Sequence, residues 1–195
     1  MTGSDIERES FRRIADLVDF SRFTRRAAEI AARIVHATGD IEIASDLIIE
    51  ERAIDRILEG LASGSTVVSD VRMAAAGIAW ARPVCSLDYA RPGEGTRSYS
   101  GMKRLLELPE ITDPVVIVGS APTALRAAIE SLSRRSIPAV IGFPVGFVDA
   151  VESKQALRLS GVPSISNGSR RGGSAMAAAA LNALERISRG EYRLG

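Results

Sequence analysis

The run PVVIVG at residues 114–119 constrains the fold of this chain more than any other segment. Its four central apolar residues are mostly β-branched and lie between a proline and a glycine, a pattern that predicts a short strand buried on both faces. The next residues open a helix, because Pro122 suits a first helical turn and Ser120 is a candidate cap. A strand, a tight turn and a helix form the repeating unit of parallel α/β sheets.

The same alternation recurs along the chain. Short apolar runs predict strands at 65–70, 82–88, 137–142 and 162–166, and apolar residues at three-and-four spacing predict helices at 4–20, 24–36, 50–64 and 175–187. We therefore expect an α/β fold, a single domain over residues 1–195, with four or five mostly parallel strands flanked by helices. The sheet is Rossmann-like without a dinucleotide fingerprint, since no Gly-x-Gly-x-x-Gly follows a strand.

Composition narrows the classes of function. The formal net charge is +1, so no large basic field is available for nucleic acid or a membrane surface. A single cysteine, Cys85, excludes an intrachain disulfide, and with a single histidine it disfavours a zinc site. The chain begins with charged residues and lacks an uncharged run of about 18, so we expect a cytoplasmic protein without a membrane span.

The only histidine, His36, is the first candidate for acid–base chemistry, because its side chain titrates near neutrality. It ends the helical pattern at 24–36, and Gly39 follows as a predicted C-cap. The negative end of the helix dipole favours the imidazolium form by up to about 2 kcal/mol. The alternative is that the ring merely caps the helix.

Charged and hydroxyl side chains follow two of the predicted strands, where open α/β sheets collect their ligand groups. Asp70 and Arg72 come after the strand at 65–70, and they form either a structural salt bridge or part of a site. Thr96, Arg97 and Ser98 begin a helix, and they offer hydroxyls, N–H groups and a guanidinium to a carboxylate.

Further candidates lie in the second half of the chain and in the first helix. The turn at 120–123, with its helix N-terminus, is an anion site by geometry alone. Arg170 and Arg171 lie among glycines and serines before the last helix, where they form either an anion site or a solvated basic loop. Ser10 lies at the edge of an apolar helix face, where a serine usually bonds back to its own helix. Arg193 and its neighbours read as a frayed tail.

Several of these segments resemble, in the same order, signature strings of the precorrin-8X methylmutases of cobalamin biosynthesis. The strings are Glu-Ser-Phe-x-x-Ile at 9–14, Ile-Val-His-Ala-Thr-Gly at 34–39, Ser-Asp-Val-Arg-Met-x-x-x-Gly-Ile at 69–78, Thr-Arg-Ser at 96–98, Ala-Pro-Thr-Ala-Leu at 121–125, Pro-Val-Gly-Phe-Val at 144–148, Glu-Ser-Lys at 152–154 and Arg-Arg-Gly-Gly-Ser-Ala-Met at 170–176. Ser120 departs from the pattern, because the family usually has asparagine there.

The resemblance covers the chain from about residue 6 to residue 184. It implies an isomerase that moves a methyl group at ring C by a 1,5-sigmatropic shift, converting precorrin-8X to hydrogenobyrinic acid or cobalt-precorrin-8 to cobyrinic acid. It implies no added cofactor, a homodimer, and His36 as the catalytic acid. The tetrapyrrole substrate would be bound by Ser10, Thr38, Asp70, Arg72, Thr96, Arg97, Ser98, Ser120, Thr123, Arg170 and Arg171.

Two other classes of function stay open. A non-catalytic corrinoid carrier would need the arginines but not His36. An α/β enzyme with a phosphorylated ligand at 120–123 would use the helix N-terminus there, although the absent glycine fingerprint disfavours it.

Overall fold

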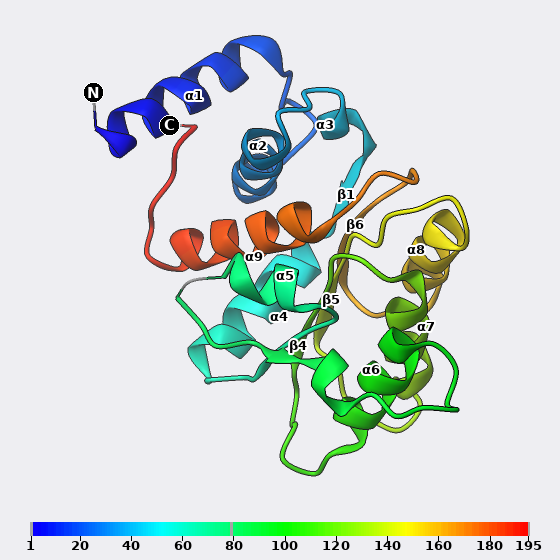
Figure 1. Cartoon of the computed structure of the whole chain (residues 1–195). Helices are drawn as coiled ribbons and strands as arrows, with labels where there is room; N and C mark the ends of the chain where they lie inside the picture. Colours follow the sequence, from blue (N-terminus) through cyan, green and yellow to red (C-terminus); the bar gives the residue numbers. More distant parts are fainter. Residues whose placement is uncertain (1, 79, 195) are drawn as a thin grey trace.

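A six-stranded sheet runs through the centre of the molecule in the order β1-β6-β5-β4-β2-β3 (Figure 1). The computed structural model describes residues 2–78 and 80–194. The strands in these ranges are β1 (Leu47–Ile49), β2 (Val67–Ser69), β3 (Val84–Cys85), β4 (Val115–Val118), β5 (Ala139–Gly142) and β6 (Ser164–Asn167). The helices are α1 (Gly3–Leu17), α2 (Arg25–Thr38), α3 (Ile43–Asp46), α4 (Glu51–Ala62), α5 (Arg72–Ala76), α6 (Arg97–Glu107), α7 (Pro122–Ser131), α8 (Ala150–Leu159) and α9 (Ser174–Ser188), with a short 3₁₀ helix η1 (Ser86–Tyr89).

The mostly parallel sheet predicted from the sequence is confirmed. The pairs β2–β3, β2–β4, β4–β5 and β5–β6 are parallel, and β1 joins β6 as an antiparallel edge strand. The sequence did not predict β1, because its three residues run directly into the helix pattern that begins at residue 51. The strand predicted at 82–88 is shorter than expected, since η1 begins at Ser86.

The two faces of the sheet are buried under different helices. Along β4, Val115 and Ile117 pack into a core that includes residues of α1, α2, α4 and α9. The alternate residues, Val116 and Val118, pack into a second core with residues of α6, α7 and α8. Figure 1 shows α9 between the sheet and α2, with α1 outermost. Because a strand exposes successive side chains to opposite faces, the continuous apolar run at 115–118 serves both cores.

Helix ends follow the local sequence signals. The side chain of Thr24 accepts a hydrogen bond from Ala27 N–H at the start of α2, and Gly39 ends that helix with φ of +66°, as the sequence predicts. Helix α1 ends at Leu17, three residues before the predicted end, because Val18 is extended with φ of −120°. None of the helices in the described ranges combines the length and the apolar character needed to span a bilayer.

The chain end is docked rather than frayed, so that prediction was wrong. Oε1 of Glu29 accepts hydrogen bonds from the N–H groups of Arg193 at 2.8 Å and Leu194 at 2.6 Å. The guanidinium of Arg25 lies 4.1 Å from the ring centroid of Tyr192. The side chain of Glu29 is buried in α2, and a buried carboxylate needs donors. The tail supplies them.

Candidate active site

The loops that follow the parallel strands form a hydrogen-bonded rim at the carboxyl edge of the sheet. Val145 N–H, after β5, donates to the carbonyl of Ser120 at 3.2 Å. Gly146 N–H donates to the carbonyl of Arg170, after β6, at 3.2 Å. Gly172, in the loop after β6, packs directly against the loop after β5. A Cβ added to it would sit 2.4 Å from the carbonyl oxygen of Phe143. The loops after β4, β5 and β6 are therefore one connected structure, as the rule for parallel sheets predicts.

The anion site predicted at the start of α7 is occupied by a side chain of the protein itself. The carboxylate of Asp70 accepts hydrogen bonds from the N–H groups of Gly119, Ser120 and Ala121 at 2.9, 2.8 and 2.9 Å. Asp70 is fully buried, and burial raises its pKa while the three N–H donors oppose that rise. The predicted cap by Ser120 is wrong, because the N-cap residue of α7 is Ala121 and no side chain caps the helix. The geometry therefore argues against a phosphorylated ligand at 120–123.

The predicted alternative of an ion pair between Asp70 and Arg72 is wrong. The guanidinium of Arg72 instead pairs with the carboxylate of Asp88 on the exposed surface. The reason is geometric: Asp70 is turned inward toward the start of α7, while α5 carries Arg72 outward. Asp70 contributes to the rim by holding the 119–121 turn.

His36 lies in the last turn of α2 and contacts two residues of α1. Its Nδ1 lies 2.8 Å from the hydroxyl oxygen of Ser10. Its ring stacks on Phe11, with centroids 5.2 Å apart and planes at 26°. Ser10 therefore does not bond back to its own helix, which was the alternative that the sequence left open. Because Nδ1 is engaged, Nε2 is the ring nitrogen left to a ligand.

Charges around His36 come from three helices, α1, α2 and α9, and from the C-terminal tail. The carboxylate of Glu7 on α1 pairs with Arg33 at 2.6 Å, and with Arg186 of α9 and Arg193 of the tail at 3.4 and 3.5 Å. Burial, and next the charge of Arg33, lower the pKa of His36 below its usual 6.5, while Glu7 raises it. The neutral ring therefore predominates at pH 7, which opposes the dipole effect expected from sequence.

The structure separates the predicted arginines into two groups. Arg171 pairs with Asp40 at 3.3 Å and Glu42 at 2.8 Å, and Arg72 is held by Asp88. Over residues 2–78 and 80–194, neither Arg97 nor Arg170 forms an ion pair, although the guanidinium of Arg170 lies 5.3 Å from the ring centroid of Phe147. These two exposed guanidiniums are the ones available to carboxylates of a ligand.

The remaining predicted residues lie at the ends of helices. The hydroxyl of Thr96 is 2.8 Å from that of Thr123, so the starts of α6 and α7 lie side by side. Ser98 lies in the first turn of α6. The hydroxyl of Thr38 donates to the carbonyl of Ile34 at 2.9 Å within α2.

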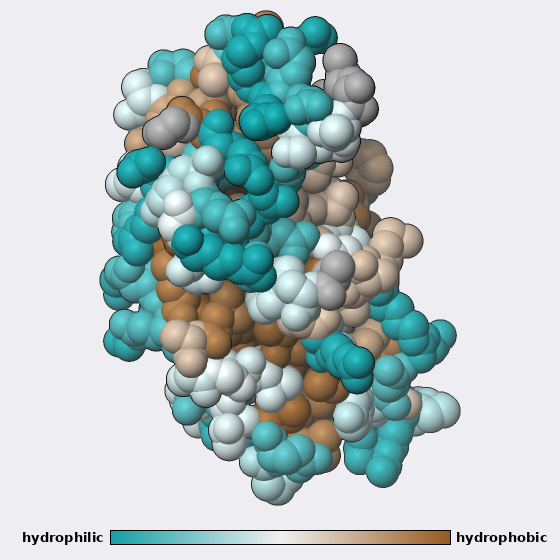
Figure 2. All heavy atoms as spheres, turned by 90° about the vertical axis from the view of Figure 1, so that its left-hand side faces the viewer, coloured by the Kyte–Doolittle hydropathy of each residue, from teal (hydrophilic) through white to brown (hydrophobic). Residues whose placement is uncertain are grey.

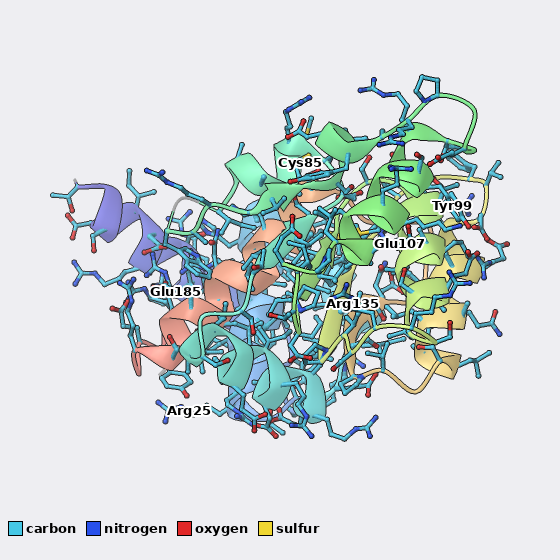
Figure 3. All side chains as sticks on the ribbon, turned by 90° about the horizontal axis from the view of Figure 1, so that it is seen from below. Arg25, Cys85, Tyr99, Glu107, Arg135 and Glu185 are labelled. Carbon is cyan, nitrogen blue, oxygen red and sulfur yellow. The ribbon has the colours of Figure 1, made fainter. Side chains whose placement is uncertain are left out.

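The helices of His36 and Arg97 lie on opposite sides of the sheet. Figure 3 shows Arg25 of α2 and Tyr99 of α6 far apart on the two sides. Both helices nevertheless reach the carboxyl edge. The end of α2 leads to Asp40, which pairs with Arg171 of the rim, and the start of α6 contacts Thr123 at the start of α7.

Sequence reasoning missed several residues that build the rim. A cleft of about 600 Å³ is lined by Glu42, Ser45, Asp46, Ser169, Arg170 and Arg171. Two charged side chains hold this lining in place. Asp46 accepts a hydrogen bond from Gly168 N–H, and the buried Lys154 donates one to the carbonyl of Arg171. No motif in the sequence pointed to Asp46, and Lys154 lies in a string noted for its resemblance alone. In the described part of the chain, no group of three or more His, Cys, Asp or Glu side chains is placed to hold a metal ion.

Comparison with known proteins assigns the fold and the family. The precorrin-8X methylmutase family model matches residues 5–187. The precorrin-8X methylmutase of Sinorhizobium sp. is 37% identical over 94% of both chains. The cobalt-precorrin-8 methylmutase of Methanocaldococcus jannaschii is 32% identical over 88% of this chain and 84% of the relative. The crystal structure of the precorrin-8X methylmutase from Thermus thermophilus superposes with a TM-score of 0.89 at 31% identity, covering 96% of this chain and 97% of that one.

The match spans nearly the whole chain and all six strands. Relatives named for precorrin-8X and relatives named for cobalt-precorrin-8 both carry the name methylmutase, which denotes an isomerase that moves a methyl group within its substrate. This chain belongs to the precorrin-8X methylmutase family of isomerases in cobalamin biosynthesis.

Proposed function

We propose that this chain converts precorrin-8X to hydrogenobyrinic acid, or cobalt-precorrin-8 to cobyrinic acid, with His36 as the group that activates the macrocycle. The observation that carries the role of His36 is the hydrogen bond between its Nδ1 and Ser10. The side chain of His36 is partly exposed, so its second nitrogen is open to a ligand.

The reaction requires His36 only to donate a hydrogen bond or a proton. A 1,5-sigmatropic shift within a conjugated ring needs no external methyl donor and no cofactor, because the bond that breaks and the bond that forms belong to the same molecule. A hydrogen bond or proton delivered to a ring nitrogen polarises the π-system. General acid catalysis of this kind contributes about 10²–10⁴-fold. With the pKa of His36 lowered, the neutral Nε2–H group is the donor at pH 7.

Arginines and hydroxyls at the rim would hold the substrate. The unpaired guanidiniums of Arg97 and Arg170 are suited to the carboxylates that fringe a corrinoid precursor. Thr96, Ser98, Ser120 and Thr123 add hydroxyls near the same edge. The hydroxyl of Thr38 can only accept from the substrate, because its proton is donated to the carbonyl of Ile34. Arg171, Arg72 and Asp70 act indirectly in this proposal, because each already binds another group of the protein.

We also propose a homodimer and a cytoplasmic location. Figure 2 shows hydrophobic surface across the lower half of one side of the molecule, beneath a largely hydrophilic upper half. Phe147 and Val148 are 87% and 83% exposed beside Arg170, and apolar side chains exposed to this extent support contact with a second copy or with the macrocycle. Analytical ultracentrifugation of the purified protein decides the oligomeric state.

The biosynthetic role of the family supports the proposed cytoplasmic location.

The absorption spectrum of the corrinoid tests the function. Purified protein is mixed with precorrin-8X, and a His36→Ala variant is run beside it. We expect the wild type to produce the spectrum of hydrogenobyrinic acid and the variant to bind the substrate and convert it at least 100-fold more slowly. Full turnover by the variant would remove His36 from the mechanism. Binding without conversion by the wild type, with precorrin-8X and with cobalt-precorrin-8, would favour the carrier.

A further inference from the structure

Lys154 on α8 is a fully buried cation close to the rim. Burying an ammonium group is costly unless its donors are satisfied. This one is satisfied by three acceptors: Oδ1 of Asn167 at 2.8 Å, the carbonyl of Arg171 at 2.8 Å, and the carbonyl of Ser169. An ammonium has three N–H donors, and each one has a partner here.

All three acceptors belong to the end of β6 and the loop that follows it. Asp46 of α3 binds the same loop. Its carboxylate accepts hydrogen bonds from Gly168 N–H at 3.0 Å and from the hydroxyl of Ser169. Asn167 connects the two charges, because its amide also donates to Asp46 at 2.7 Å. The loop is thus held between a buried cation and a carboxylate, with Arg170 between the two carbonyls that Lys154 binds.

The choice of lysine is informative in this chain. Only two of its 25 basic residues are lysines, Lys103 and Lys154. A guanidinium is planar and presents its donors as a fork, whereas an ammonium directs three donors tetrahedrally from one atom. Three oxygens converging on one point therefore require lysine, and arginine at this position would leave donors or acceptors unpaired.

We propose that Lys154 is a positioning residue that fixes the loop at 168–171 so that Arg170 projects toward the substrate. This inference rests on the proposed role of Arg170 in binding a carboxylate. Lys154 itself is buried and touches no ligand. We expect Lys154 to affect the affinity for the substrate and to have little effect on the rate at which bound substrate is converted.

Burial brings the loss of the Lys154 proton closer to neutral pH, and the charged groups around it adjust that pH. It faces Asp46 of α3, Arg158 one turn later on α8, and the loop residue Arg171. Burial, opposed by Asp46 and assisted by Arg158, lowers the pKa of Lys154 to about 8. Once the proton is lost, the amine has two N–H donors for three acceptors, and the hold on the loop weakens.

The test uses Lys154→Met, with Gln155→Met as the matched control because Gln155 is exposed on the same helix. Hydrogenobyrinic acid is titrated into each protein, and kcat and KM are measured with precorrin-8X. Hydrogen exchange of the amides at 168–173 is measured without ligand. We expect K154M to bind at least tenfold more weakly, to keep kcat within about twofold, and to exchange these amides at least tenfold faster. Q155M should match the wild type in all three.

Wild-type affinity or wild-type exchange in a folded K154M would overturn the proposal. A wild type that neither binds hydrogenobyrinic acid nor converts precorrin-8X would contradict the proposed function, and the exchange rates would still decide whether Lys154 holds the loop. If K154M does not fold, the pH dependence of the wild-type affinity for hydrogenobyrinic acid tests the proposal instead. Affinity at least threefold weaker at pH 9.5 than at pH 7 supports the proposal, and equal affinity overturns it.

Discussion

The hydroxyl oxygen of Ser10 lies 2.8 Å from Nδ1 of His36, joining α1 to the last turn of α2. The ring is held in two further ways, by stacking on Phe11 and by the docking of α1 through Glu7 and Arg33. A serine hydroxyl that donates to Nδ1 leaves the proton of the neutral ring on Nε2. The pair therefore fixes the orientation of the only imidazole in the chain.

Replacement of Ser10 by alanine should lower kcat for precorrin-8X about 3- to 10-fold. The reason is the loss of one hydrogen bond, worth about 0.5–1.5 kcal/mol, from a ring that Phe11 still holds in place. KM should change less than twofold. Ser4→Ala is the matched control, since Ser4 is exposed on the same helix. An unchanged kcat in S10A would show that the hydroxyl has no part in preparing His36.

The titration of His36 can be followed directly by NMR, because the chain has a single histidine. Burial and Arg33 lower its pKa below 6.5, and Glu7 opposes them. We therefore expect the proton on the ring carbon to titrate below pH 6.5, and at still lower pH in Glu7→Gln, which removes the negative charge. The variant Glu185→Gln, whose carboxylate pairs with Arg189 instead, should leave the titration unchanged.

The pH dependence of turnover follows from the same shift. Above the lowered pKa the ring is neutral, so kcat should be constant from pH 7 to pH 9 if neutral Nε2–H is the donor. Below the pKa the ring gains a second proton, and its bond with Ser10 reverses direction, because Nδ1–H then donates to the hydroxyl oxygen. A kcat that instead rises as the pH falls through the NMR-determined pKa would identify the imidazolium as the acid.

Much of the fold could be predicted from sequence, because strand patterns and helix caps are local. The run at 115–118 and the cap at Gly39 needed no tertiary information. The antiparallel β1 could not be predicted, since three residues carry no periodicity. The partners of charges were also hidden. Asp70 bonds to amides 49–51 positions away, and Arg171 pairs with Glu42, so only the folded topology sorts bound charges from available ones.

Replacement of Asp70 by asparagine should destabilise the protein by about 2 kcal/mol. An amide has one acceptor oxygen where the carboxylate has two, so at least one of the buried N–H groups at 119–121 loses its partner. For a chain of this size the loss corresponds to a fall in Tm of about 4–8 °C. Asp88→Asn removes the surface partner of Arg72 and should cost at most about 1 kcal/mol. Equal effects in thermal denaturation would contradict the structural role of Asp70.

Arg97 and Arg170 should govern the affinity for the substrate, and Arg134 should not. Both guanidiniums stand at the carboxyl edge of the sheet. Arg97 lies at the start of α6, and Arg170 lies on the loop after β6. Arg134 is also exposed, but it lines a separate pocket of about 240 Å³ with Lys103 and Glu130. A charge-assisted hydrogen bond to a carboxylate contributes about 1.5–3 kcal/mol, so Arg97→Gln and Arg170→Gln should each raise KM about 10- to 100-fold. Since neither residue contacts His36, kcat at saturation should fall much less. Arg134→Gln should match the wild type. If all three variants weakened binding equally, general charge attraction would explain the affinity, and the assignment of two specific carboxylate sites would be wrong.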